Sequence, residues 1–261
     1  MRPVPTKEGP ALPEWLSRQL GTEVDALGQA SELLVIDCGR SDYEVSLRAQ
    51  LRLVQLRRQG SMPDALVLTE HDPVITVGRT AEPDEVPDAR RLARHGIALR
   101  EASRGGKATY HGPGQLVGYP IMDLRDRGMD LHKHMERLQQ AVVTALRRIG
   151  VHAQSLPGHR GVWVDGRKIT SIGIAVRRWV TYHGFAININ CDLTPFGLFT
   201  PCGIHGVEMT SLAREIDGPV EARRVSDAVV EAFAEQFGYT ALRRYAEPCM
   251  TAAGVWPRIA G

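Results

Sequence analysis

Apolar residues recur along the chain in short runs that are typical of β-strands. Each run is four to eight residues long and is bounded by polar residues, glycine or proline. The predicted strands are 33–37, 65–69, 74–77, 97–101, 116–122, 161–164, 169–176 and 185–189. We expect a turn at His71-Asp72-Pro73 to join the second and third of them, and a two-residue hairpin turn at Asp165-Gly166.

Apolar residues at steps of three and four predict three helices. The first is expected to start at a Ser41 cap and to end before Gly60. The clearest covers 130–149, and the last is expected to start at a Ser226 cap. Residues 80–96 predict a surface loop with a short helix.

The order of these elements predicts the domain organisation. The chain has no internal repeat and no linker that would divide it, so we expect one α/β or α+β domain, a mixed sheet flanked by helices. A loose extension is expected at 1–30, with one short helix near 14–20, and the main domain at 31–245. The chain after Gly238 shows no periodicity, and 246–261 is expected to be an irregular tail.

Composition narrows the class of protein but not its chemistry. The chain has 261 residues, of which 43% are hydrophobic and 24% charged, values typical of globular domains. A net charge of +2 gives no electrostatic indication of nucleic-acid binding. No apolar run is long enough to span a membrane, and the N-terminus lacks the apolar segment of a secretory signal. We therefore expect a cytoplasmic protein with no membrane or nucleic-acid partner.

Four widely spaced cysteines, Cys38, Cys191, Cys202 and Cys249, form no C-x-x-C pair. They are too few for a disulfide scaffold and wrongly spaced for zinc, so we expect free thiols. Cys202 differs from the others because it lies between Pro201 and Gly203, in a rigid turn that would present a thiol to a ligand. A nucleophilic role needs a group that favours the thiolate, and a buried structural thiol is the alternative.

Groups that could favour the thiolate are Lys168, His183 and His205. Lys168 stands at the mouth of an apolar strand, where a solvated hairpin residue is the ordinary interpretation. A lysine buried there would lose part of its pKa and could serve as acid and base. The nine histidines have no recognised ligand spacing, and His132 and His134 face different sides of their helix, so no metal site is expected.

A glycine-rich stretch, RGGKATYHGPGQ at 104–115, places four glycines in twelve residues. Such a turn lets backbone N–H groups approach a phosphate, a carboxylate or an acyl carbonyl. Neither a P-loop nor a dinucleotide-binding G-x-G-x-x-G is present. A tight structural turn is the alternative.

Three motifs in this order resemble the octanoyltransferase family, also called lipoyl(octanoyl) transferases or LipB. They are RGGKATYHGPGQLVGYPI, GRKITSIGIAV followed by HGFAINI, and PCGI followed by MTSL, and the resemblance spans about 33–240. It implies a single domain (31–245) with the fold of biotin and lipoate protein ligases. It also implies transfer of an octanoyl group from octanoyl-acyl carrier protein to a lysine ε-amine of a lipoyl domain. Lipoyl domains of 2-oxoacid dehydrogenases and the glycine cleavage H protein are such acceptors, and a monomer without a cofactor is implied.

The resemblance also implies the roles of individual residues. Cys202 would be the nucleophile that carries the acyl group as a thioester, and Lys168 would lower its pKa and act as acid and base. The residues implied to bind substrate are Arg104, Gly105, Gly106, Lys107, Ala108, Thr109, Tyr110, His111, Ser171, Ile172, Gly173, Gly184, Phe185 and Ala186. The alternatives are an ATP-dependent lipoate or biotin protein ligase, and a non-catalytic binding module of the same fold.

Overall fold

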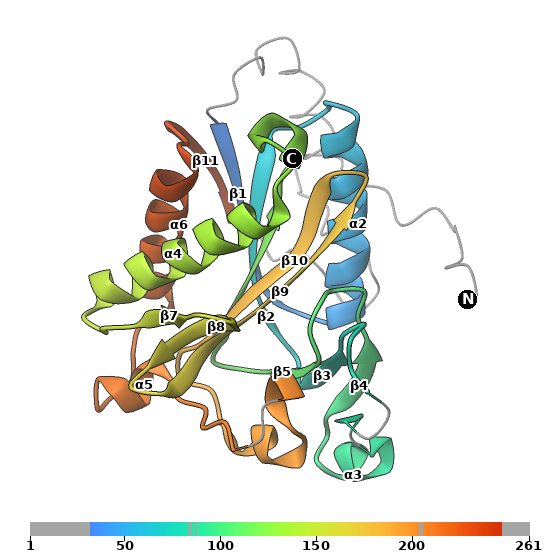
Figure 1. The fold of residues 1–261 in the computed structure, drawn as a ribbon, viewed down its shortest axis with the longest axis vertical. Coiled ribbons are helices and arrows are strands. Elements are labelled where there is room, and N and C mark those ends of the chain that lie inside the picture. Colours follow the sequence, from blue (N-terminus) through green and yellow to red (C-terminus); the bar gives the residue numbers. More distant parts are fainter. Residues whose placement is uncertain (1–31, 83–84, 87, 204–205, 247–261) are drawn as a thin grey trace, which may run out of the picture.

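Figure 1 shows the computed structural model, which describes residues 32–82, 85–86, 88–203 and 206–246. Its largest element is a mixed β-sheet of eight strands within these residues. In spatial order they are β11 (Ala241–Ala246), β1 (Glu32–Ser41), β2 (Asp64–His71), β6 (Gln115–Ile121), β10 (Val180–Asn188), β9 (Arg167–Arg177), β8 (His159–Val164) and β7 (Gln154–Leu156). Strands β11, β1 and β2 are parallel, and every later neighbour is antiparallel.

A second, smaller sheet lies beside the large one. It consists of β4 (Ala98–Glu101), β3 (Val74–Val77) and β5 (Ala108–His111). Strands β3 and β4 are parallel, and β5 runs antiparallel to β3. Its apolar side chains pack with the chain around Phe196 and Met209 in a hydrophobic cluster of their own.

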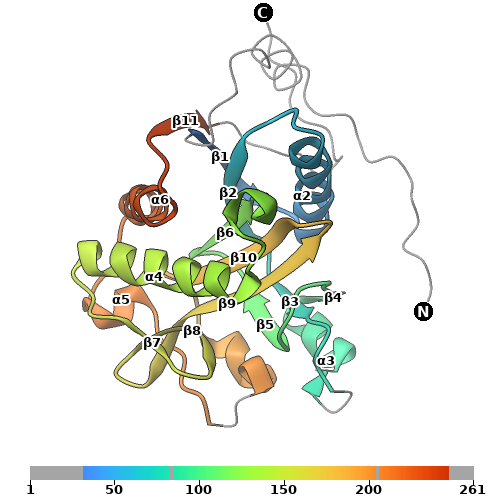
Figure 2. The ribbon, with the colours of Figure 1, turned by 45° about the horizontal axis from the view of Figure 1, so that its top comes forward.

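Helices cover both faces of the large sheet (Figure 2). α2 (Tyr43–Arg58) lies on one face, and α4 (Leu131–Ile149) and α6 (Ala222–Phe237) pack together on the other. The amphipathic pattern of α4 explains its position, because its buried residues recur at helical spacing. Short helices are α3 (Ala89–Arg94), α5 (Leu212–Glu215) and the 3-10 helices η3 (Leu124–Arg127), η4 (Thr194–Leu198) and η5 (Pro201–Gly203).

The predicted strands and helices are found within a few residues of their expected bounds, and the turn at Asp165-Gly166 joins β8 to β9. The expected helix caps at Ser41 and Ser226 are wrong. Asp42 caps α2, because its carboxylate accepts hydrogen bonds from the N–H groups of Glu44 and Val45. Ser226 lies inside α6, which begins after Glu221.

Four further features differ from expectation. β2 and β3 follow one another but belong to different sheets. β5 lies within the glycine-rich stretch, and the chain after Gly238 forms β11 where an irregular tail was expected. β11 escaped notice because it is an edge strand whose side chains are largely exposed. Cys38 is disulfide-bonded rather than a free thiol. The expected short helix near 14–20 lies outside the described residues.

No helix in the described part of the chain is long and apolar enough to cross a membrane.

Candidate active site

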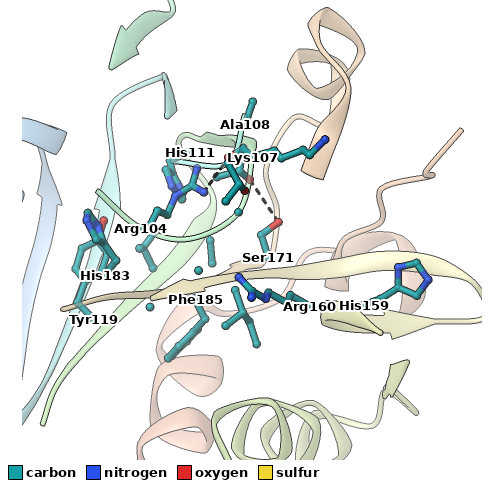
Figure 3. Close-up of a pocket in the computed structure, with 18 of the residues that line it drawn as sticks. Arg104, Lys107, Ala108, His111, Tyr119, His159, Arg160, Ser171, His183 and Phe185 are labelled. Carbon is teal, nitrogen blue, oxygen red and sulfur yellow. Dashed lines mark hydrogen bonds between the residues drawn. The ribbon is translucent and has the colours of Figure 1, made fainter. Parts of the chain in front are cut away.

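A cavity of about 320 Å³ lies between the two sheets (Figure 3). Its floor comes from β9 and β10, where Ser171 pairs with Ala186 and Gly173 with Gly184. Its roof comes from β5 and the glycine-rich loop that precedes it. The hydroxyls of Thr109 in the roof and Ser171 in the floor are 3.4 Å apart.

Arg104 holds the roof in shape. Its guanidinium donates to the carbonyl and the hydroxyl of Thr76, both at 2.7 Å, and to the carbonyl of Lys107 at 2.9 Å. The N–H of Gly105 donates to the carbonyl of Ile174 on β9 at 3.0 Å, so the loop is tied to the floor as well. Because the guanidinium donates hydrogen bonds to two backbone carbonyls and a hydroxyl, Arg104 fixes the conformation of the loop. Arg104 also forms part of the cavity wall.

Most of the residues that the resemblance implies for substrate binding line this cavity. They are Arg104, Gly106, Lys107, Ala108, Thr109, His111, Ser171, Ile172, Gly173, Gly184, Phe185 and Ala186. Gly105 and Tyr110 do not line it. Tyr110 points to the opposite side of β5 because side chains alternate along a strand, and its ring packs edge-on against Phe196 at 5.6 Å.

Lys168 is buried to 1% exposure, which excludes a solvated hairpin residue. Its N–H donates to the carbonyl of Glu208, and its carbonyl accepts from the N–H of Thr210. Its ammonium nitrogen lies 5.3 Å from the centre of the Trp163 ring. Lys168 does not line the cavity itself, but the β7–β8 hairpin, which covers its side chain, does so through Gly158, His159 and Arg160.

Gly161 on that hairpin makes room for the lysine. Its φ of +130° is a conformation that glycine adopts readily and other residues do not. A Cβ at this position would lie 2.7 Å from Cε of Lys168 and 2.5 Å from the carbonyl oxygen of Thr170. The neighbouring residues Gly158, His159 and Arg160 line the cavity, so the lysine is buried directly behind one end of it.

Cys202 lies in η5, which packs against β5 in the roof of the cavity. The structure describes its backbone position but not its side chain. The next residue, Gly203, lies against the side chain of Lys107, and Lys107 forms an ion pair with Glu85. The turn that carries the cysteine therefore borders the cavity at its Lys107 end.

Of the two histidines considered as partners of Cys202, the structure describes only His183. His205 lies outside the described residues. His183 lies across the cavity from Arg160, beside Tyr119 (Figure 3). Burial lowers the pKa of His183 to about 3, so the ring is neutral near pH 7, and its Nε2 lies 3.1 Å from the hydroxyl of Ser103. A neutral ring there cannot replace an ammonium in favouring a thiolate.

Four cavity-lining residues were missed from the sequence, namely Tyr43, Thr80, Val117 and Tyr119, in addition to Gly158, His159 and Arg160. Tyr43 opens α2 and Tyr119 lies in β6, and no local motif links these positions to the glycine-rich loop. The hydroxyl groups of Tyr43 and Tyr119, which burial keeps neutral by raising their pKa values, give one end of the cavity a polar character that the resemblance did not imply.

Buried amides connect that end to the strand of Lys168. Nδ1 of His111 lies 2.8 Å from Oε1 of Gln115, whose Nε2 donates to Oδ1 of Asn188 at 2.9 Å. Nδ2 of Asn188 donates to the carbonyl of Thr210, and the N–H of Thr210 donates to Lys168. This series of hydrogen bonds holds the roof, the floor and the lysine strand in one arrangement.

Among the described residues, no three His, Cys, Asp or Glu side chains are grouped so that they could hold a metal ion.

Comparisons with known proteins identify the family of the chain. The family model of the lipoyl protein ligase A/B catalytic domain matches residues 42–234. An octanoyltransferase of Geobacter metallireducens is 42% identical over 77% of this chain and 92% of its own. An octanoyltransferase of Geobacter sulfurreducens is also 42% identical, over 77% of this chain and 83% of its own.

The fold is that of the lipoate and biotin protein ligases. A crystal structure of lipoate-protein ligase A bound with ATP superposes with a TM-score of 0.69 at 20% identity, over 84% of this chain and 90% of the ligase. Biotin protein ligase from Aquifex aeolicus with biotin and ATP gives a TM-score of 0.51 at 14% identity, over 78% and 70% of the two chains. Taken with the closer sequence relatives, these matches mean that the chain belongs to the octanoyltransferases, acyltransferases of the lipoyl protein ligase A/B catalytic domain family.

Proposed function

We propose that this octanoyltransferase takes its acyl group from octanoyl-acyl carrier protein and passes it to a lysine of a lipoyl domain, with Cys202 and Lys168 as the catalytic residues. The acceptors would be lipoyl domains of 2-oxoacid dehydrogenases or the glycine cleavage H protein. The family and the fold support the type of reaction, and the buried lysine beside the cavity supports the mechanism.

In the first step the thiolate of Cys202 attacks the carbonyl carbon of the donor thioester. A new C–S bond forms, the carrier sulfur leaves, and the ammonium of Lys168 protonates it. In the second step the acceptor amine attacks the enzyme thioester. The neutral amine of Lys168 takes a proton from the attacking nitrogen, and the Cys202 thiolate leaves as the amide forms. The cycle returns both residues to their starting states.

The observation that carries this proposal is the complete burial of Lys168, at 1% exposure, behind the end of the cavity. A buried ammonium is costly unless a negative group faces it, and a thiolate at the turn of Pro201–Gly203 would be such a group. The apolar part of the cavity, around Ile172 and Phe185, suits an alkyl chain, and each buried methylene contributes about 0.8 kcal/mol.

Two alternatives share the fold. An ATP-dependent ligase would activate a free acid as an adenylate and would not need Cys202. A non-catalytic binding module would hold the acyl group or its carrier without forming a bond. The transferase differs from both because it becomes covalently acylated by a thioester donor in the absence of ATP.

Intact-mass spectrometry tests this difference. The chain is incubated with octanoyl-acyl carrier protein without ATP, and we expect its mass to rise by one octanoyl group. The mass should stay unchanged in Cys202→Ser. The matched control is Cys191→Ala, because Cys191 is a buried free thiol whose pKa burial raises to about 12. This control should still be acylated.

Each result has a clear meaning. An adduct that survives in Cys202→Ser, or that disappears in Cys191→Ala, contradicts the assignment of the nucleophile. Transfer that occurs only from octanoate and ATP supports the ligase. Tight binding of the donor with neither an adduct nor transfer supports the binding module.

A further inference from the structure

The end of the cavity farthest from the proposed reaction is polar, although an octanoyl chain ends in a methyl group. Tyr43, His111, Tyr119 and His183 line this end and are 8% exposed or less. The opposite end is formed by Gly158, His159 and Arg160, which are exposed. From this exposure we infer that the cavity opens near the β7–β8 hairpin and closes at the buried rings; Figure 3 shows His159 and Arg160 on one side and Tyr119 and His183 on the other.

The hydrogen bonds around these rings define which atoms remain available. Nδ1 of His71 lies 2.9 Å from the carbonyl oxygen of Ser41, which only accepts, so Nδ1 carries the proton. Nε2 of His71 therefore accepts the hydroxyl hydrogen of Tyr119 at 2.6 Å. His71 and Tyr119 satisfy each other and form a fixed part of the wall.

The same reasoning leaves one acceptor on His111. Nε2 of Gln115 donates to the carbonyl of Tyr110, which orients the amide so that its Oε1 faces His111. Nδ1 of His111 donates to that oxygen, and Nε2 is left as a lone acceptor. This Nε2 has no hydrogen bond to any residue that the structure describes, and burial lowers the pKa of His111 to about 3, which keeps the ring neutral.

A donor stands beside this acceptor. The hydroxyl of Tyr43 is buried and has no hydrogen-bond partner among the described residues. Its ring is stacked with that of His111 at an interplanar angle of 10°, with 6.4 Å between the ring centres. That separation is typical of an offset stack, and both rings line the cavity. A buried hydroxyl without a partner is costly, so this arrangement favours an occupant that supplies one.

We propose that Tyr43 and His111 form a polar subsite at the closed end of the acyl cavity, which binds a hydroxyl group at the far end of a medium-chain acyl group. A hydroxyl matches the subsite because it accepts from Tyr43 Oη and donates to His111 Nε2 at the same time. The proposal rests on the function proposed above insofar as it takes the cavity to be the acyl site.

The register of the floor sets the depth of the subsite. Ile174, which pairs with His183, lies three residues beyond Ser171 on β9, an advance of about 10 Å at the rise of a strand. That is close to the extended length of an eight-carbon acyl chain. A longer alkyl chain would press its methyl group against the unpartnered hydroxyl and imidazole and leave them without water, so the same subsite would limit chain length.

Two acids of equal length and different ends test the subsite by direct binding. 8-Hydroxyoctanoic acid and nonanoic acid have the same number of chain atoms, and calorimetry measures their affinities for the full chain without any transfer reaction. An apolar end wall would favour nonanoic acid. We expect the hydroxy acid to bind about tenfold more tightly, because its hydroxyl makes hydrogen bonds with the subsite that the methyl group of nonanoic acid cannot make.

Tyr43→Phe removes the donor and keeps the ring, and should abolish this preference. Tyr245→Phe is the matched control, because Tyr245 is a half-buried tyrosine on the edge strand β11 and should leave the preference unchanged. Thermal unfolding of each variant shows that it is folded. The same comparison is made with pairs of acids one carbon shorter and one carbon longer, and the pair with the largest preference gives the depth of the subsite.

A wild-type chain that prefers the alkyl acid in every pair, or binds neither member, overturns the subsite. A preference for the hydroxy acid that persists in Tyr43→Phe also overturns the subsite. Failure of the transferase mechanism would look different, because it appears as a missing octanoyl adduct while binding of the acids is unaffected.

Discussion

The α-carbon of Gly203 lies directly against the side chain of Lys107, so that a methyl group added there would collide with Cδ of Lys107 and come within 2.7 Å of its Cε. The same methyl group would lie 2.7 Å from the carboxylate of Glu85, the ion-pair partner of Lys107. The position of the Cys202 turn therefore depends on a glycine that packs against an ion pair in the cavity roof.

Gly203→Ala should lower the transfer rate more than it lowers stability. The substitution forces the turn and the ion pair apart, and small displacements of a nucleophile reduce rates by about a hundredfold. Gly206→Ala is the control, because Gly206 also has a positive φ (+73°) but has no atom within 4 Å of an added Cβ. Both variants should lose about 1 kcal/mol of stability through backbone strain, and only Gly203→Ala should lose activity. Equal rates in the two variants would contradict this role of the ion pair.

Removal of the Lys168 ammonium should make the Cys202 thiol less reactive. In Lys168→Met the alkyl part of the side chain is kept and the positive charge is lost, so the thiolate loses its proposed partner. Alkylation of Cys202 by iodoacetamide, followed against pH by mass spectrometry, should shift to higher pH. Lys133→Met, on the exposed side of α4, should leave the profile unchanged. An unshifted profile in Lys168→Met would mean that another group activates the thiol.

Buried neutral histidines should make the fold sensitive to mild acid. Burial lowers the pKa of His71 and His134 to about 4 and that of His111 and His183 to about 3. In the unfolded chain each titrates near pH 6.5, so below that pH the unfolded state binds more protons. Stability should be fully present above pH 6.5 and fall towards pH 4, by up to about 1.4 kcal/mol per pH unit for each histidine. Urea unfolding at a series of pH values measures this slope.

His134 provides a specific test of that slope. Neither ring nitrogen has a hydrogen-bond partner among the described residues, and the ring packs against Phe237 at 5.3 Å. His134→Leu should therefore reduce the dependence of stability on pH by one group and raise stability at pH 5. His132→Leu, two residues earlier on the exposed side of α4, should do neither. A slope that is unchanged in His134→Leu would assign the acid sensitivity to other groups.

Much of the fold could be predicted from the sequence because its elements bury one side or both. The runs that became β2, β6 and β9 are nearly all buried, and α4 carries a clear helical stripe. Elements without such a pattern were missed. β5 is hidden among glycines, and β11 is an exposed edge strand with two arginines.

The candidate site likewise has a part that could be predicted from the sequence and a part that could not. The glycine-rich loop and the Lys168 strand are continuous segments, so their residue types carried the resemblance. The polar end of the cavity could not be predicted, because Tyr43, His111, Tyr119 and His183 come from α2, β5, β6 and β10. Only the packing of these four elements brings the rings together, and no spacing along the chain encodes it.

The separate hydrophobic cluster of the small sheet has a consequence for how this family can diversify. The residues behind the roof of the cavity, such as Ile75 and Tyr110, belong to that cluster, whereas Ile172 and Phe185 in the floor belong to the main core between the large sheet and helices α4 and α6. Volume changes at sites that share no neighbours have nearly additive effects on stability. Substitutions in the small cluster should thus change the packing behind the roof of the cavity with little effect on the larger cluster. The proposed acyl site would in this sense be adjustable from its roof, with the packing of the larger cluster unchanged.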